Sequence, residues 1–503
     1  MVLMVLTLAC AAPVGQGKQA ATADRGEDSG GVVHDSGVPM ETWFVDEDGD
    51  GHGNGAVSIE AAAPPPAGHV ALGDDCDDTD PHISPSAPEI CGNGHDDNCD
   101  GGPGDCPPGG RVAVDAALRL RGGEPGAGLG AALAWLPSPH ARLLVGAPGA
   151  GRTGEGAVLM VDLEEGSATV STDTHAAVVG PLDQGGLGTT LQALGDGFAA
   201  GAPDSIGNAG AVLIFDADGG ELARVEGRRA GDRLGTALSL GEGALLLGVP
   251  DDVTSGRRGA VERVSLDTTG PLSARSSLRI EGTSPGSGFG GALSWGDLDG
   301  DGLGDLVVGA ASADEGRVLI FAGPVMDGVE SDAEITILGG ASNGALGTGV
   351  CIGGDIDGNG TPDLLVSAPA GGVLVRVDGG AAMATPGVRP VLELADGRVV
   401  DIRSSVGHVA PAGDLDGDGL HDVIAAGPHG FWGPLVGVHS VDDAPLQLLS
   451  VEAEGGISPP GWIGLGLPAE GGSPFGRLAF GGPTLEVSGT AAGEVQVFSA
   501  SGL

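Results

Sequence analysis

Three short segments of the sequence carry oxygen-bearing residues at alternating positions, the arrangement with which a calcium loop surrounds its ion. Side-chain oxygens would come from positions 1, 3, 5 and 9 and a backbone carbonyl from position 7, while a glycine at position 6 permits the sharp turn. Residues at this spacing can bind one hard cation. The expected ligands are Asp297, Asp299, Asp301, Leu303 and Asp305 in the first loop, Asp355, Asp357, Asn359, Thr361 and Asp363 in the second, and Asp414, Asp416, Asp418, Leu420 and Asp422 in the third.

The residues that follow each loop distinguish it from an EF-hand. An EF-hand has flanking helices and a Glu at position 12, whereas Val308, Val366 and Ala425 occupy that position here. Each loop runs directly into an apolar segment, which indicates a calcium loop within a β-hairpin. A single Asp-Gly pair is usually only a hairpin turn, but three copies with one spacing favour metal sites. Loops crowded with carboxylates favour calcium over magnesium, which requires strict octahedral geometry.

These loops lie within a longer repeat that must position them. A Leu-Gly or Phe-Gly pair, or a variant of it, occurs seven times, at spacings of 58, 47, 55, 57, 60 and 57 residues. A Gly-Ala-Pro element or a variant follows each pair, and a short apolar strand follows that element. The pairs are Leu129-Gly130, Leu187-Gly188, Leu234-Gly235, Phe289-Gly290, Leu346-Gly347, Val406-Gly407 and Ile463-Gly464, and the second elements begin at Gly146, Gly201, Gly248, Gly309, Ser367, Ala426 and Gly481.

This pattern resembles the FG-GAP repeat, the blade unit of the β-propeller in integrin α-subunits, which also occurs in bacterial surface proteins. The resemblance implies an all-β fold in which residues 116–503 form a seven-bladed β-propeller, with calcium in hairpin loops of the later blades. Fourth strands are expected at Leu222–Glu226, Leu278–Glu281 and Glu334–Leu338. The last unit has no room for one, so Ala117–Arg121 is expected to pair into the last blade and close the ring, which removes an exposed sheet edge.

Residues 42–106 differ in composition and predict a separate, small metal-binding module. An oxygen ladder of the same spacing recurs there, and we expect at least one further Ca²⁺ site. Four cysteines in a short exported segment imply two disulfides, with three possible pairings. The ladder is Asp46, Asp48, Asp50, His52 and Asn54, and the cysteines are Cys76, Cys91, Cys99 and Cys106.

The identity of the metal in this module is left open between two classes. Together with Pro88-Glu89-Ile90-Cys91, its Asp runs resemble a metal-binding module of bacterial surface proteins, some of whose relatives are associated with copper. The dense carboxylates favour calcium. Imidazole groups suit copper and zinc, and the module holds His52, His69, His82 and His95.

The N-terminal residues indicate export. Residues 1–10 form an apolar run that ends in Leu8-Ala9-Cys10 and resembles a bacterial lipoprotein signal, in which Cys10 is lipidated; an ordinary cleaved signal is the alternative. Residues 11–41 are polar and predict a flexible tether. Cys351 lies in an expected propeller strand, as a buried small apolar residue. We therefore expect an exported protein of the cell envelope, held at the outer membrane or cell surface through its lipid.

The charge of the chain restricts its partners. With 69 acidic and 22 basic residues the formal net charge is −47, which excludes nucleic acid as a partner and leaves the lipid as the only expected membrane contact. No catalytic constellation fits its context, so we expect no enzyme. The preferred function is calcium-dependent adhesion or binding of an extracellular protein or glycan. A passive coat protein and a hydrolase of an extracellular polymer are the alternatives.

Overall fold

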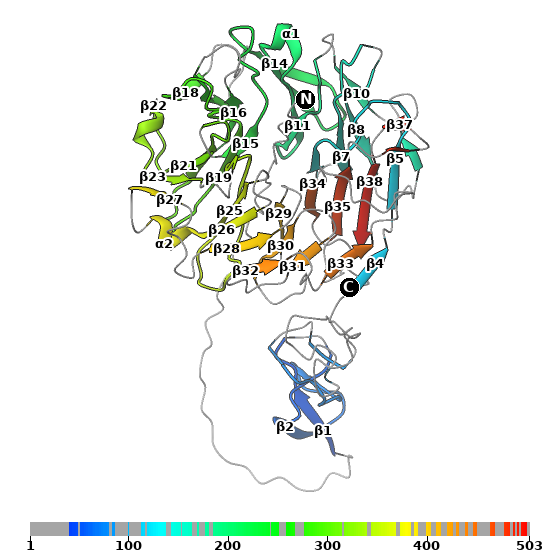
Figure 1. The fold of residues 1–503 in the computed structure, drawn as a ribbon. Coiled ribbons are helices and arrows are strands. Elements are labelled where there is room, and N and C mark those ends of the chain that lie inside the picture. The colour runs from blue at the N-terminus through cyan, green and yellow to red at the C-terminus, as the bar shows by residue number, and fades with distance from the viewer. Residues whose placement is uncertain are drawn as a thin grey trace. The chain divides into compact units, whose positions relative to one another are not determined.

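The computed structural model (Figure 1) describes the chain in segments that cover most of the first five repeat units and the core strands of the last two. The described residues are 40–48, 51–79, 83–85, 99, 112–115, 118–136, 142–151, 153–162, 168–170, 177–180, 185–241, 243–250, 258–266, 276–313, 316–339, 344–368, 373–383, 387–390, 399–403, 409–413, 420–425, 429–431, 438–440, 446–449, 463–467, 477–482, 486–487, 490–491 and 494–499.

The described residues belong to two compact units, one within Ala12–Gly110 and one within Arg111–Leu503. The first unit contains a three-stranded antiparallel sheet in the order β2-β1-β3. Its strands are β1 (Met40–Val45), β2 (Ser58–Ala62) and β3 (His69–Val70). β1 begins one residue before the predicted end of the tether at residue 41. Trp43 of β1 is buried, and its indole N–H donates to the carbonyl of Ala61, 3.1 Å away.

The second unit contains seven sheets of four or five strands, one for each repeat unit. We number them sheet 1 to sheet 7. Sheet 1 is β6 (Leu133–Leu136), β7 (Arg142–Ala147), β8 (Ala157–Val161) and β10 (Ala177–Val179), and sheet 2 is β11 (Thr190–Ala193), β12 (Gly197–Ala202), β13 (Ala211–Asp216) and β14 (Glu221–Glu226). Sheet 3 is β15 (Leu238–Gly241), β16 (Ala244–Val249), β17 (Ala260–Ser265), β18 (Ser276–Glu281) and β22 (Gly328–Val329).

The remaining four sheets have five strands each. Sheet 4 is β19 (Ala292–Gly296), β20 (Asp305–Gly309), β21 (Arg317–Phe321), β23 (Ile335–Leu338) and β27 (Gly387–Pro390); sheet 5 is β24 (Gly349–Ile352), β25 (Asp363–Ala368), β26 (Val373–Asp378), β28 (Val399–Arg403) and β32 (Val438–Ser440). Sheet 6 is β29 (Val409–Gly413), β30 (Asp422–Ala425), β31 (His429–Phe431), β33 (Leu446–Leu449) and β4 (Val112–Asp115); sheet 7 is β34 (Ile463–Leu467), β35 (Arg477–Gly482), β38 (Glu494–Ser499), β5 (Leu118–Gly122) and β9 (Ala168–Val170).

Little else in the described chain is regular structure. The short elements are α1 (Ser205–Asn208), α2 (Gly379–Met383), the 3-10 turn η2 (Glu330–Asp332) and a small hairpin of β36 (Glu486–Val487) and β37 (Thr490–Ala491). None of the described helices is long and apolar enough to cross a bilayer. The fold is therefore all-β, as predicted, and the strands predicted as fourth strands are β14, β18 and β23.

The sheets follow one another around a closed ring. The first strand of each sheet contacts the first strand of the next, in the order β6, β11, β15, β19, β24, β29 and β34, and β34 contacts β6. In sheets 3 to 7 a further strand joins the outer edge in parallel: β22, β27, β32, β4 and β9, each from the part of the chain that leads into the next fourth strand. This arrangement is propeller-like.

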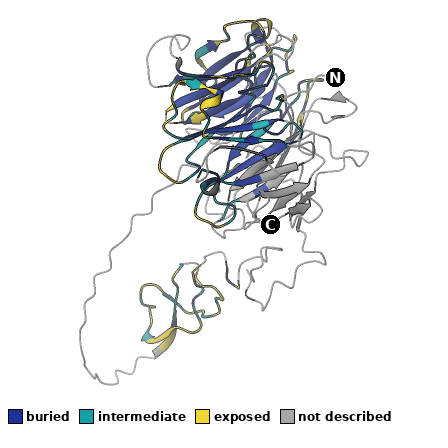
Figure 2. Ribbon diagram, turned by 60° about the vertical axis from the view of Figure 1, so that its left-hand side comes forward, coloured by how far each residue is buried: buried dark blue, intermediate teal, exposed yellow. Residues whose placement is uncertain are grey.

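Both faces of the inner strands are buried, which explains their continuous apolar sequences. Successive side chains of a strand point to opposite faces. In β7, Leu143 and Val145 pack into the cluster that also contains Leu120 and Val495, while Leu144 packs into the cluster shared with sheet 2. Figure 2 shows the result as strands that are dark blue along their length. Burial by small aliphatic side chains agrees with the 3% aromatic content.

The two glycines of the repeat signature lie where neighbouring sheets meet. Gly290 has a φ of +90° and donates its N–H to the carbonyl of Gly309 in the same unit, 3.1 Å away. A Cβ added at Gly309 would lie 2.1 Å from the carbonyl oxygen of Gly347, the pair glycine of the next unit. The same holds for three other pairs. A Cβ added at Gly146, Gly201 or Gly248 would lie 2.0, 2.2 or 2.2 Å from the carbonyl oxygen of Gly188, Gly235 or Gly290, respectively. Glycine is therefore required in the Phe-Gly pair because φ is positive there, and in the Gly-Ala-Pro element because the backbone of the next repeat unit lies too close for a Cβ.

The ring is closed by strands from both ends of the unit. β5 pairs antiparallel with β38, with Leu120 opposite Val495 and Arg121 opposite Glu494; in Figure 1 β5 is cyan beside the red β38. Leu120 and Val495 are both buried. This agrees with the expected closure by residues 117–121, of which 118–121 are described and pair with β38. The sequence did not indicate that β4, directly before β5, pairs in parallel with β33 of sheet 6.

Replacing Gly309 by alanine tests the contact between neighbouring sheets. The added methyl group would force the backbones of sheets 4 and 5 apart, so Gly309→Ala should lower the free energy of unfolding by about 3 kcal/mol. Gly195→Ala is the matched control: Gly195 has a φ of +81°, and an added Cβ would meet nothing within 4 Å. It should cost only about 1 kcal/mol, from backbone strain. Equal losses in a denaturant titration would contradict the role given to this contact.

Candidate metal centres

The first predicted loop connects β19 to β20 and is held by its own backbone amides. Asp297 accepts the N–H groups of Gly300 and Gly302, at 2.8 and 2.9 Å. Asp299 accepts the N–H of Asp301 at 3.1 Å, and Asp301 accepts that of Leu303 at 2.7 Å. These short-range bonds fix the turn.

Three of the predicted ligands in this loop come together. Carboxylate oxygens of Asp297, Asp299 and Asp301 lie within 4.8 Å of one another. No ion pair joins them to a basic side chain anywhere in the described chain. Three hard oxygen donors with uncompensated negative charge fit a divalent cation. Leu303, whose carbonyl was predicted as a ligand, is 42% exposed, and its N–H donates to Asp301.

Asp305 lies outside this group and has a different environment. It is 1% exposed, and its two oxygens accept the N–H groups of Leu298 and Gly323, at 2.8 and 2.9 Å. Burial raises the pKa of Asp305, and the nearby Asp299 and Asp301 raise it further, while the two N–H donors act in the opposite direction. The carboxylate therefore connects the end of the loop to the segment after β21, whether or not an ion is bound.

The second loop connects β24 to β25 and has the same internal bonds. Asp355 accepts the N–H groups of Gly358 and Gly360, at 2.8 and 2.7 Å. Asn359 accepts the N–H and the hydroxyl of Thr361, at 2.8 and 2.6 Å. Here the carboxylates that come together are Asp355, Asp357 and Asp363, again within 4.8 Å.

A side chain from outside the loop, Arg376 of β26, contacts these carboxylates, and the sequence analysis did not identify it. Its Nη1 lies 2.7 Å from Asp357 Oδ2 and 2.6 Å from Asp363 Oδ1, and the residue is 1% exposed. Burial raises the pKa of Asp363 to about 7, although Arg376 opposes the shift. The signal in the sequence was a single arginine within the apolar segment Val373–Val377.

The third loop lies largely outside the described residues. Asp414, Asp416 and Asp418 are not described, and Leu420 precedes β30. Asp422 is the first residue of β30, as Asp305 is of β20 and Asp363 is of β25. The backbone position of the ninth residue is therefore the same in all three loops.

The ladder in the N-terminal unit is described except for Asp50. His52 Nδ1 lies 2.8 Å from Asp74 Oδ1, so the imidazole is held by a carboxylate from outside the ladder. Asn54 accepts the N–H of Ala56 at 2.9 Å. Asp46 and Asp48 follow β1 in the same unit. The described part of this ladder forms no group of three carboxylates like those of the other two loops.

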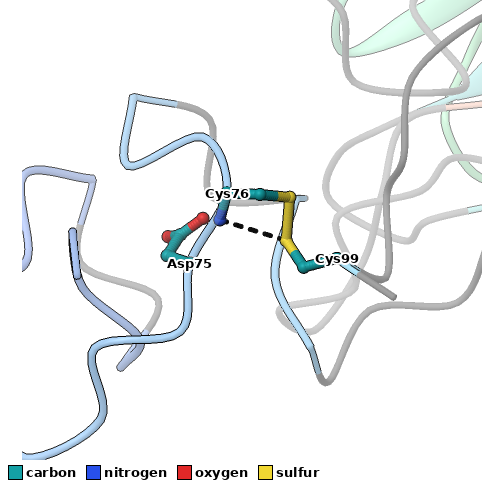
Figure 3. Close-up of side chains that lie close together, drawn as sticks. All are labelled: Asp75, Cys76 and Cys99. Carbon is teal, nitrogen blue, oxygen red and sulfur yellow. Dashed lines mark hydrogen bonds between the residues drawn. A yellow bond between two sulfur atoms is a disulfide. The ribbon is translucent and has the colours of Figure 1, made fainter. Parts of the chain in front are cut away.

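The cysteines of this unit form at least one disulfide. Cys76 is bonded to Cys99 across 23 residues, and the N–H of Cys76 also points at Cys99 Sγ, 3.1 Å away (Figure 3). Asp75 lies beside them, but disulfide sulfurs are not thiolates and do not serve as metal ligands. Cys91 and Cys106 are outside the described residues. Cys351 is buried, as expected of a small apolar residue in a strand. It is also disulfide-bonded, which was not expected.

Comparison with known proteins agrees with the two patterns of the sequence. The family described as "FG-GAP repeat" matches residues 289–321, from the Phe-Gly pair through the first loop to the end of β21. The family described as "Putative metal-binding motif" matches residues 75–103. The chain therefore contains an FG-GAP repeat and an N-terminal metal-binding motif.

Curated relatives extend the likeness beyond one repeat. Integrin alpha-7 of Homo sapiens is 34% identical over 187 residues, and that of Rattus norvegicus is 33% identical over the same length. The match covers 34% of this chain but spans only 16% of the length of those proteins. Among solved structures, the WD40 domain of coronin from Toxoplasma gondii has a TM-score of 0.43 and 14% identity, over 77% of this chain and 88% of that one. Over 187 residues, therefore, the sequence is similar to integrin alpha-7.

The two kinds of aspartate in the first loop can be separated by substitution in the presence of a chelator. Asp305→Asn leaves one buried N–H facing an amide NH₂ group, so it should lower the free energy of unfolding by about 1–3 kcal/mol without any ion. Asp301 is exposed, and an asparagine there can still accept the N–H of Leu303. Asp301→Asn should therefore change the stability by less than about 0.5 kcal/mol. Thermal unfolding in chelator measures both, and a larger loss for Asp301→Asn would contradict the assignment.

Proposed function

We propose that this chain is an exported, calcium-binding surface protein whose seven-bladed β-propeller binds an extracellular protein or glycan, as an adhesion module does. The observation that carries the proposal is the group of Asp297, Asp299 and Asp301 inside the segment that matches the FG-GAP repeat. The likeness to integrin alpha-7 supports ligand binding rather than a purely structural role. Under this proposal the chain has no enzymatic activity and does not bind nucleic acid.

The proposed blade number rests on the sheets themselves. Seven sheets of at least four strands correspond to the seven repeats, and their first strands contact one another in cyclic order. A propeller protects its sheet edges by this radial repetition. The rigid ring would then present loops from several blades to one ligand, on the face opposite the calcium hairpins.

Calcium is the cation that the loops favour. Their donors are carboxylate and carbonyl oxygens on short turns, and such sites in extracellular proteins typically bind Ca²⁺ with dissociation constants of about 10⁻⁴ to 10⁻³ M. We propose that the ion neutralises the repulsion among the carboxylates and stiffens the hairpin. The N-terminal unit would contain a further Ca²⁺ site at Asp46, Asp48, Asp50, His52 and Asn54, and the third loop another at Asp414, Asp416, Asp418, Leu420 and Asp422.

Export is supported by the Cys76–Cys99 disulfide, because disulfides persist in oxidising compartments. We propose that Cys10 is lipidated and anchors the chain at the outer membrane or cell surface, with residues 11–41 as the tether. The lipid would be the only contact with the membrane.

Calcium should raise the melting temperature, and chelation should lower it. At a free concentration one hundred times the dissociation constant, one site adds about 2.7 kcal/mol to the free energy of unfolding. The double substitution Asp299→Asn and Asp301→Asn should remove the part of this gain that belongs to the first loop. Asp196→Asn is the control, because Asp196 is exposed in the equivalent hairpin of the second repeat unit, which lacks the calcium-loop motif. A melting temperature that does not respond to calcium would refute the structural role of the ion.

The function itself is tested by capture of a ligand. The purified chain, immobilised, is incubated with envelope and matrix extracts in calcium and in chelator, and bound proteins and glycans are identified. Retention of a specific partner in calcium, lost with the double substitution of the first loop, would support adhesion. Absence of any specific partner in both conditions would favour a passive coat protein.

A further inference from the structure

The loops of units four and five have the same backbone but differ in one buried charge. In β20 and β21, Val307 lies opposite Ile320. In β25 and β26, the equivalent residues are Leu365 and Arg376. An arginine thus occupies, in unit five, the position that an apolar residue occupies in unit four. Both residues are buried, at 0% exposure for Ile320 and 1% for Arg376.

The guanidinium of Arg376 already binds two of the carboxylates that would bind the ion. Its Nη1 lies 2.7 Å from Asp357 and 2.6 Å from Asp363, where a divalent cation would also be attracted. The Nε and Nη2 atoms are buried without a hydrogen-bond partner. Because a buried charge is costly unless it is paired, displacing Arg376 from these carboxylates would be unfavourable.

The two loops also differ in the net charge at their ligand positions. The first loop has four carboxylates at its ligand positions, and none of them is paired with a basic side chain in the described chain. The second has three, because Asn359 replaces the fifth-position Asp, and it has one guanidinium. Calcium affinity in such loops rises with the number of ligand charges.

We propose that Arg376 acts as a built-in cation in the loop of unit five, so that this loop keeps its shape without an ion and binds Ca²⁺ much more weakly than the loop of unit four. This inference rests on the proposed calcium-binding function and divides the sites into two classes. The loop of unit four responds to calcium, whereas the loop of unit five, which connects β24 to β25, is held permanently to β26 by Arg376.

The test replaces the arginine within its own loop. Arg376→Met keeps most of the side-chain volume and removes the charge, so calcium titrated calorimetrically into the whole chain should show one site tightened at least tenfold. Adding Asp357→Asn should abolish that gain, which assigns it to unit five. Since the comparison is made within one loop, the surrounding carboxylates, including Asp378 on the same strand as Arg376, are the same in both proteins.

Two matched variants separate charge from packing. Arg376→Lys retains the charge and should leave the affinity within twofold of the original protein. Ile320→Met makes an apolar change of similar size in unit four and should not tighten any site. If the Met variant unfolds in chelator, the calcium concentration that restores its near-ultraviolet circular dichroism gives the affinity instead.

The outcomes distinguish this inference from the function on which it rests. Calcium affinities of Arg376→Met that stay within twofold of the original protein, or a gain that Arg376→Lys shares, would overturn the role of the arginine. Loss of the strongest site in Asp301→Asn tests the calcium function separately, since that variant leaves Arg376 and its partners unchanged.

Discussion

The packing of neighbouring sheets depends on a close backbone contact between glycines of successive repeat units. The position equivalent to a side chain at Gly309 is filled by the carbonyl of Gly347, and the same geometry recurs at Gly146, Gly201 and Gly248. This contact sets how closely the inner strands approach, and hence how the apolar faces on both sides of each sheet are buried. The loops that carry the aspartates begin where these strands end, so their spacing is a consequence of the ring and not of the loops alone.

The acidic loops are held by backbone amides before any ion is considered. Asp297 and Asp355 each accept two N–H groups from glycines of their own loop. Asp305 and Asp363 accept the N–H groups of Leu298 and Ile356, so each joins the end of its loop to the start. A strongly acidic chain can therefore keep its turns in shape, and a cation would act on charge repulsion and stiffness and not on the path of the backbone. In unit five an arginine from the neighbouring strand provides part of that charge compensation.

Much of the architecture was predictable because a repeat shows the same physical requirement many times. The seven Leu-Gly or Phe-Gly pairs predicted the number of sheets, and the lack of a fourth strand in the last repeat unit predicted the closure by β5. The nine-residue spacing predicted two groups of aspartates. Single features were not predictable. Arg376 reaches its carboxylates only after β25 and β26 pair, and the parallel strand β4 has no recurring signature. The position-9 aspartate was predicted only as a ligand, whereas the burial of Asp305 and its bonds from the N–H groups of Leu298 and Gly323 indicate an anchor.

The closure of the ring has a consequence for the order of folding. Arg121 and its partner Glu494 are 373 residues apart in the sequence, whereas most strands of sheets 1 to 5 pair with near neighbours. During synthesis the early sheets can form as soon as they emerge, but β5 has no antiparallel partner until the final strand is made, and β4 waits for β33. Pairing over such a distance carries a large loop-closure entropy and is slow. A ribosome that stops before β38 would thus release a chain whose first strands, and not only its last, present open edges.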